Sequence, residues 1–153
     1  MSIEIGSRFS RWRARATGSL IAFGALVAAL PAYGETAEDS IALELNDASA
    51  NAKACRLSFV IANDQSAAID DMALELVLFD KDGRVERFVV VRSGKVPAGK
   101  DRVRQFDIPE TGCADIGRVL LNDVKECAGA GLTPPLCSDR IKASSRTAIG
   151  FEN

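Results

Sequence analysis

Residues 72–91 read MALELVLFDKDGRVERFVVV, and this stretch indicates the fold more clearly than any other part of the chain. Its first half alternates, so one face of an extended strand collects four apolar side chains: Met72, Leu74, Leu76 and Leu78. Val77 and Phe79 make the opposite face partly apolar, which is typical of a strand in the centre of a sheet. The Asp-Gly pair at 82–83 is a tight-turn signature, and a β-branched run over 85–91 follows it. The stretch therefore predicts a β-hairpin.

Comparable short segments continue on both sides of this hairpin. They cover residues 41–45, 55–61, 102–108, 116–124 and 147–151. No window shows a convincing helical period, although residues 114–126 are ambiguous between strand and helix. The VPAGK stretch at 96–100 predicts a hairpin turn between the strands over 85–91 and 102–108. Several short strands separated by turns over about a hundred residues are typical of a sandwich. The sequence thus predicts an all-β fold, an Ig-like β-sandwich of about seven strands.

The N-terminal segment has the composition of a secretory signal peptide. Its basic residues precede the apolar run LIAFGALVAAL at 20–30, and they are Arg8, Arg11, Arg13 and Arg15. Ala32 and Gly34 are the small residues that a signal peptidase needs, so we expect cleavage before Glu35. This divides the chain into a signal peptide, residues 1–34, and one domain, residues 35–153. The apolar run is shorter than the roughly 20 residues of a membrane span, so we expect no stable span after cleavage. A retained N-terminal anchor is the alternative.

Removal of this leader changes the composition in an informative way. The chain has no His, and its only Trp and only Tyr are Trp12 and Tyr33, both in the leader. Residues 35–153 hold 15 basic and 20 acidic side chains, a net charge of −5. An acidic domain whose only aromatic residues are Phe is a poor nucleic-acid binder. We therefore expect no nucleic-acid partner, no cofactor and no catalytic residues. A His-less redox or hydrolytic enzyme is the alternative.

The four cysteines, Cys55, Cys113, Cys127 and Cys137, all belong to residues 35–153. An even number of cysteines in an exported domain indicates disulfides. Of the three possible pairings we favour Cys55–Cys113 with Cys127–Cys137, because the second bond closes a short Gly/Pro-rich loop. The first would tie together strands far apart in sequence, and Cys55 shares the apolar face of its strand. A metal site has little support without His or a Cys-x-x-Cys pair.

A basic cluster is the sharpest positive feature of the domain. Its arginines, which form the candidate site for an anionic partner, are Arg84, Arg87, Arg92, Arg102 and Arg104. With Lys95 and Lys100, and against Glu86 and Asp101, they give a local charge of +5 between residues 84 and 104. Such a patch fits an acidic envelope protein or an anionic surface. The alternative is that these charges guard an exposed strand edge against pairing with other chains.

Two motif-like stretches are better explained by turns than by ligands. Residues 94–101 (GKVPAGKD) begin like a phosphate-binding loop, but Pro97 removes a backbone donor, and a strand pattern follows instead of a helix. Asp80 and Asp82 resemble the start of a calcium loop, but the twelfth position is Val91, where such a loop has Glu. The sequence therefore predicts neither a nucleotide site nor a metal site.

Several of these segments resemble the strand succession of Ig-like domains in periplasmic proteins. They are residues 55–63 (CRLSFVIAN), 76–83 (LVLFDKDG), 97–100 (PAGK) and 106–108 (FDI). Residues 113–127, with IGRVLLNDV at 116–124, resemble more closely a family of uncharacterised exported proteins of Gram-negative bacteria. The resemblance implies a periplasmic location and supplies no activity or catalytic residues. We therefore expect a non-enzymatic binding, adaptor or complex-stabilising module, whose partner and oligomeric state the sequence leaves open.

Overall fold

The computed structural model describes residues 39–153, so the predicted signal peptide lies outside the described residues. The strands are β1 Ile41–Asn51, β2 Ala54–Asn63, β3 Asp71–Asp80, β4 Val85–Arg92, β5 Lys100–Pro109, β6 Ile116–Ala128, β7 Ile141–Ser145 and β8 Gly150–Glu152. A short 3-10 turn, η1, covers Cys113–Asp115, and one helix, α1, covers Pro134–Arg140.

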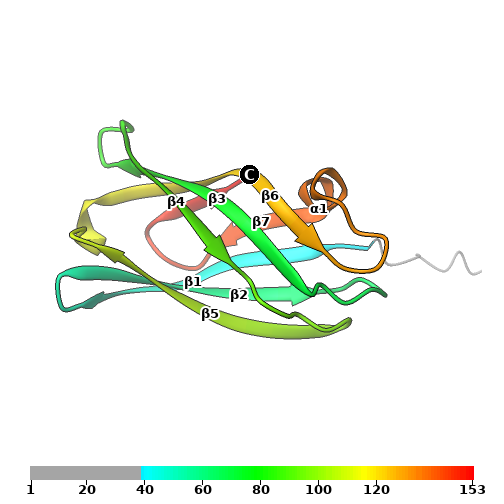
Figure 1. Ribbon diagram of the computed structural model, residues 1–153. Coiled ribbons are helices and arrows are strands. Elements are labelled where there is room, and N and C mark those ends of the chain that lie inside the picture. Colours follow the sequence, from blue (N-terminus) through cyan, green and yellow to red (C-terminus); the bar gives the residue numbers. More distant parts are fainter. Residues whose placement is uncertain (1–38) are drawn as a thin grey trace, which may run out of the picture. The chain divides into compact units, whose positions relative to one another are not determined.

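The strands form two four-stranded sheets stacked as layers (Figure 1). The first sheet has the order β5-β2-β1-β7 and the second has the order β4-β3-β6-β8. The chain alternates between the two sheets, with β1 and β2 in the first, β3 and β4 in the second, then β5, β6, β7 and β8 in turn. This Greek-key path is that of an Ig-like sandwich. The predicted fold class is confirmed, with eight strands described in place of about seven.

The core lies between the sheets and follows the predicted alternation. All four apolar residues of the β3 inner face are 2% exposed or less: Met72, Leu74, Leu76 and Leu78. Phe59 of β2 packs against Phe106 of β5, with ring centroids 6.0 Å apart, and against Phe151 of β8, with centroids 5.2 Å apart. Because β2 and β8 belong to different sheets, the Phe59–Phe151 contact joins the two layers.

The predicted hairpin is formed by β3 and β4, with Leu76 opposite Val89. At its turn, Oδ1 of Asp80 accepts hydrogen bonds from the backbone N–H groups of Asp82 at 2.9 Å and Arg84 at 2.8 Å. Gly83 has φ 77, in the left-handed region that a residue without Cβ adopts readily. The local backbone thus uses the Asp80 carboxylate as a turn cap.

The second predicted hairpin is wrong. β5 pairs with β2 of the first sheet, whereas β4 pairs with β3 of the second, so residues 93–99 cross between the sheets. Val96 anchors this crossing: it is fully buried and exchanges backbone hydrogen bonds with Ile69 at 3.0 and 2.8 Å. A turn that contains Pro and Gly is compatible with a hairpin and also with a connection between two sheets. The burial of Val96 fits the connection between the sheets.

The C-terminal prediction is wrong in detail. The expected strand over 147–151 is a turn followed by the three-residue β8, which begins at Gly150. Helix α1 and strand β7 were not predicted. β7 pairs parallel with β1, from Ile41 opposite Ile141 to Leu45 opposite Ser145, and β8 pairs parallel with β6. The last segment therefore extends both sheets on the side opposite to β4 and β5.

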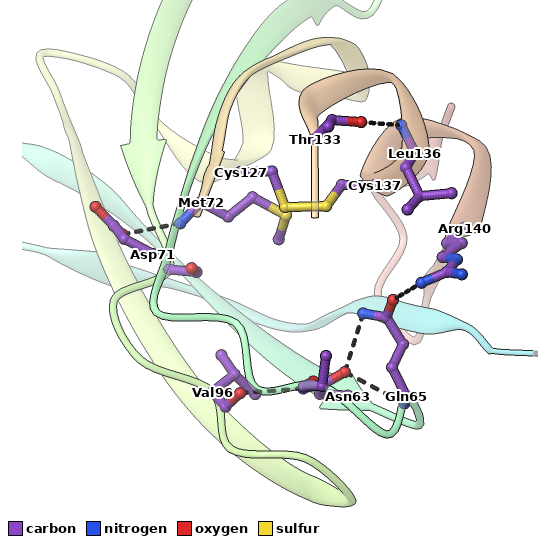
Figure 2. The surroundings of a disulfide bond; sticks show 12 residues. Asn63, Gln65, Asp71, Met72, Val96, Cys127, Thr133, Leu136, Cys137 and Arg140 are labelled. Atoms are coloured by element: carbon purple, nitrogen blue, oxygen red, sulfur yellow. Dashed lines mark hydrogen bonds between the residues drawn. A yellow bond between two sulfur atoms is a disulfide. The ribbon is translucent and has the colours of Figure 1, made fainter. Parts of the chain in front are cut away.

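Both favoured disulfides are confirmed. Cys55 of β2 bonds to Cys113 of η1, with Cα atoms 4.9 Å apart. Cys127 of β6 bonds to Cys137 of α1, with Cα atoms 6.5 Å apart, and so holds the helix at the end of the second sheet (Figure 2). Cys55 and Cys137 are fully buried.

Candidate interaction surface

The residues singled out in the sequence lie on or beside two edge strands. β4 is the outermost strand of the second sheet, and β5 is the outermost strand of the first. Nη1 of Arg87 on β4 donates to the backbone oxygen of Pro109 on β5 at 2.8 Å, so the two edges lie on the same side of the sandwich. We call the gap between them the β4–β5 seam.

Two of the five predicted arginines bind carboxylates. Nε of Arg92 donates to Asp71 at 2.7 Å, and Nη2 donates to Glu126 at 2.5 Å. These bonds raise the pKa of the Arg92 guanidinium above its ordinary value, with Glu126 contributing most and Asp71 next. Arg84, in the β3–β4 turn, pairs with Asp82 at 3.1 Å. The charge of Arg92 is thus matched by two acids of its own sheet.

The other three arginines donate to backbone oxygens. Arg87 closes one end of the seam through Pro109, and Nε of Arg104 closes the other through the oxygen of Ser93 at 2.5 Å. Nη1 of Arg102 donates to the oxygen of Asp101 at 2.7 Å. Arg102 and Arg104 are two residues apart in β5 and therefore lie on the same face of the strand, as predicted. The five arginines are therefore spread over the β3–β4 turn, β4 and β5. Their side chains bind nearby carboxylates and backbone oxygens of the same domain.

The seam itself is tightly packed. It contains an apolar pocket of about 10 Å³, lined by Leu43, Phe59, Leu74, Leu76, Val91, Ser93 and Phe106. A single water molecule needs about 10–15 Å³ of such volume. The space therefore has no room for an inserted strand or a small-molecule ligand.

A feature that sequence reasoning missed is the exposed apolar surface beside this seam. Among residues 39–153 the large apolar side chains that are exposed are Val85, Phe88, Val90 and Val103. The first three belong to β4, on its outer face, and we call them the β4 strip; Val103 belongs to β5. Phe88 lies opposite Val77 of β3, which is itself buried. The signal in the sequence was the β-branched run over 85–91, which is apolar on both faces.

The backbone of β4 has one free edge. Ser93 N donates to Met72 O at 2.9 Å, so the odd-numbered residues from 87 to 93 turn their N–H and C=O groups toward β3. Phe88, Val90 and Arg92 consequently turn theirs away from the sheet. An exposed apolar strip on an unpaired strand edge is an arrangement that binds another strand.

The described residues were also compared with the requirements of a metal site and of a membrane span. Within residues 39–153 no three His, Cys, Asp or Glu residues converge on a point where a metal ion would bind. The same residues include no helix of the length and apolarity needed to cross a membrane. All four cysteines are in disulfides. Comparison of the chain with protein-family models, with curated proteins and with solved structures found no match.

Proposed function

We propose that this chain is a non-enzymatic module of the periplasm, exported through a cleaved signal peptide, which acts by adding the free edge of β4 to another protein chain. The observation that carries the proposal is the β4 strip. Phe88 is 61% exposed and Val90 is 57% exposed, on a strand whose backbone groups are unpaired along one edge. Exposed apolar residues that adjoin a free edge mark a binding surface or an aggregation hazard.

Two observations favour a binding module over a His-less enzyme. A redox enzyme needs a reactive, accessible sulfur, whereas Cys55 and Cys137 are fully buried. A hydrolase needs an enclosed cleft, whereas the apolar pocket in the seam measures only about 10 Å³ and the hollow of about 390 Å³ beside Asp39, Asp139, Arg140 and Lys142 is largely open to solvent. Binding to an anionic surface has weaker support than strand addition, because the five arginines are spread over the β3–β4 turn, β4 and β5, and Arg84 and Arg92 already pair with acidic side chains.

The test is photo-crosslinking of the exported full chain in living cells. A photoreactive phenylalanine analogue replaces Phe88 on β4 or, as the matched control, Val103 on β5, which is 60% exposed. We expect discrete adducts from position 88 and none from position 103. Absence of adducts at position 88, or equal adducts at both positions, would overturn strand addition through β4. Mass spectrometry of the same protein should find Glu35 as its first residue.

A further inference from the structure

We infer that the chain which covers the β4 edge is a second copy of this protein, paired antiparallel so that a twofold axis passes through Val89. The inference rests on the proposed function, because both use the free edge of β4. It names the partner at that edge and the register of the pairing.

The backbone of β4 limits the registers that are possible. In an antiparallel pair, hydrogen bonds form where residues that turn their N–H and C=O groups outward lie opposite each other. On β4 these are Phe88, Val90 and Arg92. A twofold axis through residue 88, 89 or 90 places even-numbered residues opposite even-numbered ones, whereas an axis between two residues does not. Three central registers remain.

The side chains select one of these three registers. With the axis at Val89, Phe88 lies opposite Val90 of the second copy, and Val90 lies opposite its Phe88. These are aromatic–β-branched pairs, which stabilise antiparallel sheets. The axis at Phe88 would place Val90 opposite Glu86 of the second copy, where β4 bulges out of the regular ladder. The axis at Val90 would place Phe88 opposite Arg92.

Charge supports the same register. With the axis at Val89, Glu86 of each copy faces Arg92 of the other. The Glu86 side chain makes no hydrogen bond or ion pair within residues 39–153. Arg92 binds Asp71 and Glu126 through Nε and Nη2, which leaves Nη1 for the second copy. β4 bulges at Glu86, because Leu78 lies opposite Arg87 and the next residue, Phe79, lies opposite Val85. The regular ladder therefore covers residues 87–92, and Glu86 contributes through its side chain.

The edges formed by β5 and β7 are poor alternatives, and β8 has only three residues. On β5, Glu110 N donates to Lys53 O, so the odd-numbered residues face outward, and among them Pro109 has no N–H to donate. A twofold axis at Arg104 would place Asp101 opposite Asp107 of the second copy. On β7, the side chain of Asn153 accepts from Ala143 N at 3.2 Å and donates to Ile141 O at 3.0 Å. These contacts occupy that edge.

Pairing through β4 would join two second sheets into one continuous eight-stranded sheet, with Phe88 of each copy packed beside Val90 of the other on its outer face. The interface is isologous, so it closes after two copies and leaves no second β4 edge for growth of a fibre. The closed dimer thereby removes the aggregation hazard that an exposed edge strand carries.

Solution mass tests the pairing. Light scattering on the purified full-length export product should give twice the mass of one chain for the wild type and for Val103→Lys, and the mass of one chain for Val90→Lys. Val90 and Val103 are 57% and 60% exposed, so the two substitutions are matched. Thermal unfolding will show that Val90→Lys remains folded. A wild type of single-chain mass at all concentrations would refute the inference, as would equal dissociation of both variants.

Engineered cysteines test the register. At the axis, Val89 of each copy forms a non-hydrogen-bonded pair with Cα atoms about 4.5 Å apart, within the range of a disulfide. Oxidised Val89→Cys should therefore run as a covalent dimer, and Phe88→Cys should not, because its partner is Val90. Crosslinking of Phe88→Cys alone would overturn the register. Adducts from position 88 with a different protein would refute self-pairing and leave the proposed strand addition standing, whereas no adducts would refute both.

Discussion

At the scale of single residues, Asn63 makes four hydrogen bonds through its buried side chain. It is fully buried at the end of β2, where its Nδ2 donates to the backbone oxygens of Ala67 at 2.9 Å and Val96 at 3.1 Å. Its Oδ1 accepts from Nε2 of Gln65 at 3.1 Å, and Oε1 of Gln65 accepts from Arg140 of α1 at 2.5 Å (Figure 2). One amide thus joins the crossing segment around Val96 to the loop after β2, and Gln65 extends the connection to the helix.

Asn63→Ala should destabilise the fold, because the Ala67 carbonyl oxygen and the Gln65 amide lose a partner, and the Val96 oxygen keeps only its bond from Ile69 N–H. A buried polar group left without a partner costs about 1–3 kcal/mol, and we expect a loss in that range in the free energy of unfolding by urea. The control is Asn122→Ala, whose amide donates to Glu75 at the surface. A surface change of this kind should stay within about 0.5 kcal/mol of the wild type. Equal losses for the two variants would contradict a structural role for Asn63.

Asp71 makes stability depend on pH. Its burial raises its pKa, but hydrogen bonds from Arg92, Met72 N and Gly94 N outweigh this, and its pKa lies below the ordinary value of 3.8. A carboxylate whose pKa is lowered by folding stabilises the protein above its unfolded pKa, and this contribution is lost as pH falls through the folded pKa. Stability should therefore decline below about pH 4.

Asp71→Asn should be less stable than the wild type at neutral pH and should lose less stability between neutral and acidic pH. Urea unfolding midpoints measured across that range give both quantities. The control is Asp101→Asn, because the Asp101 side chain makes no ion pair within residues 39–153. If Asp71→Asn followed the wild-type pH curve in parallel, the coupling between Asp71 and Arg92 would have no part in acid stability.

At the scale of elements, period-two alternation was sufficient to predict strands but insufficient to predict their neighbours. The alternation over 72–79 correctly indicated a central strand, and β3 lies between β4 and β6. The run over 85–91 is apolar on both faces as well, yet β4 is an edge strand. The pattern of apolar side chains indicates whether each face of a strand is buried. It does not indicate whether each edge of the strand is hydrogen-bonded to a neighbouring strand. The exposed strip at Phe88 and Val90 was therefore not predictable, although the arginine run pointed to the correct two strands.

The short elements α1 and β7 were not predicted for a different reason. Helix α1 has seven residues, too few for a helical period to appear, although Thr133 before Pro134 is a recognisable helix start. In β7 only Ile141 is buried, and Ala143 is half-buried, so the alternation is weak. The disulfide pairing, in contrast, was predicted correctly, because the sequence distance between the cysteines and the strand face of Cys55 both favoured the observed pairs.

The junction between β3 and β6 depends on a glycine. A Cβ added to Gly117, near the start of β6, would lie 2.4 Å from the backbone oxygen of Asp80. Backbone cannot move away as a flexible side chain can, so Gly117→Ala should cost about 1–3 kcal/mol. Gly150→Ala in β8 is the matched control, because its nearest neighbour would be Cβ of Arg118 at 3.4 Å. Chemical unfolding of both variants checks this, and equal midpoints would contradict it.

At the scale of the whole molecule, the two disulfides close loops of very different length. Cys55 and Cys113 are 58 residues apart, and Cys127 and Cys137 are 10 apart. Each pair includes a fully buried cysteine, so the packing lost on replacement by Ala is similar. A longer closed loop restricts the unfolded chain more, giving about 4 kcal/mol for the first bond and about 3 kcal/mol for the second.

Replacing Cys55 and Cys113 together should therefore destabilise the protein more than replacing Cys127 and Cys137 together. Urea unfolding of the two double variants, both without free thiols, gives the comparison directly. The reverse order would show that the Cys127–Cys137 bond acts mainly on the folded state, by holding α1 against β6.

The parallel contact between β1 and β7 has a mechanical consequence. A force that pulls residue 39 and residue 153 apart first peels away β8, which has only three paired residues. It then draws β1 and β7 in opposite directions along their length. Because the five residue pairs between them run parallel, their hydrogen bonds resist in shear and must fail together instead of opening one after another. Single-molecule extension should show one high-force rupture, and Ser144→Pro, which removes a backbone N–H that faces β1, should abolish it.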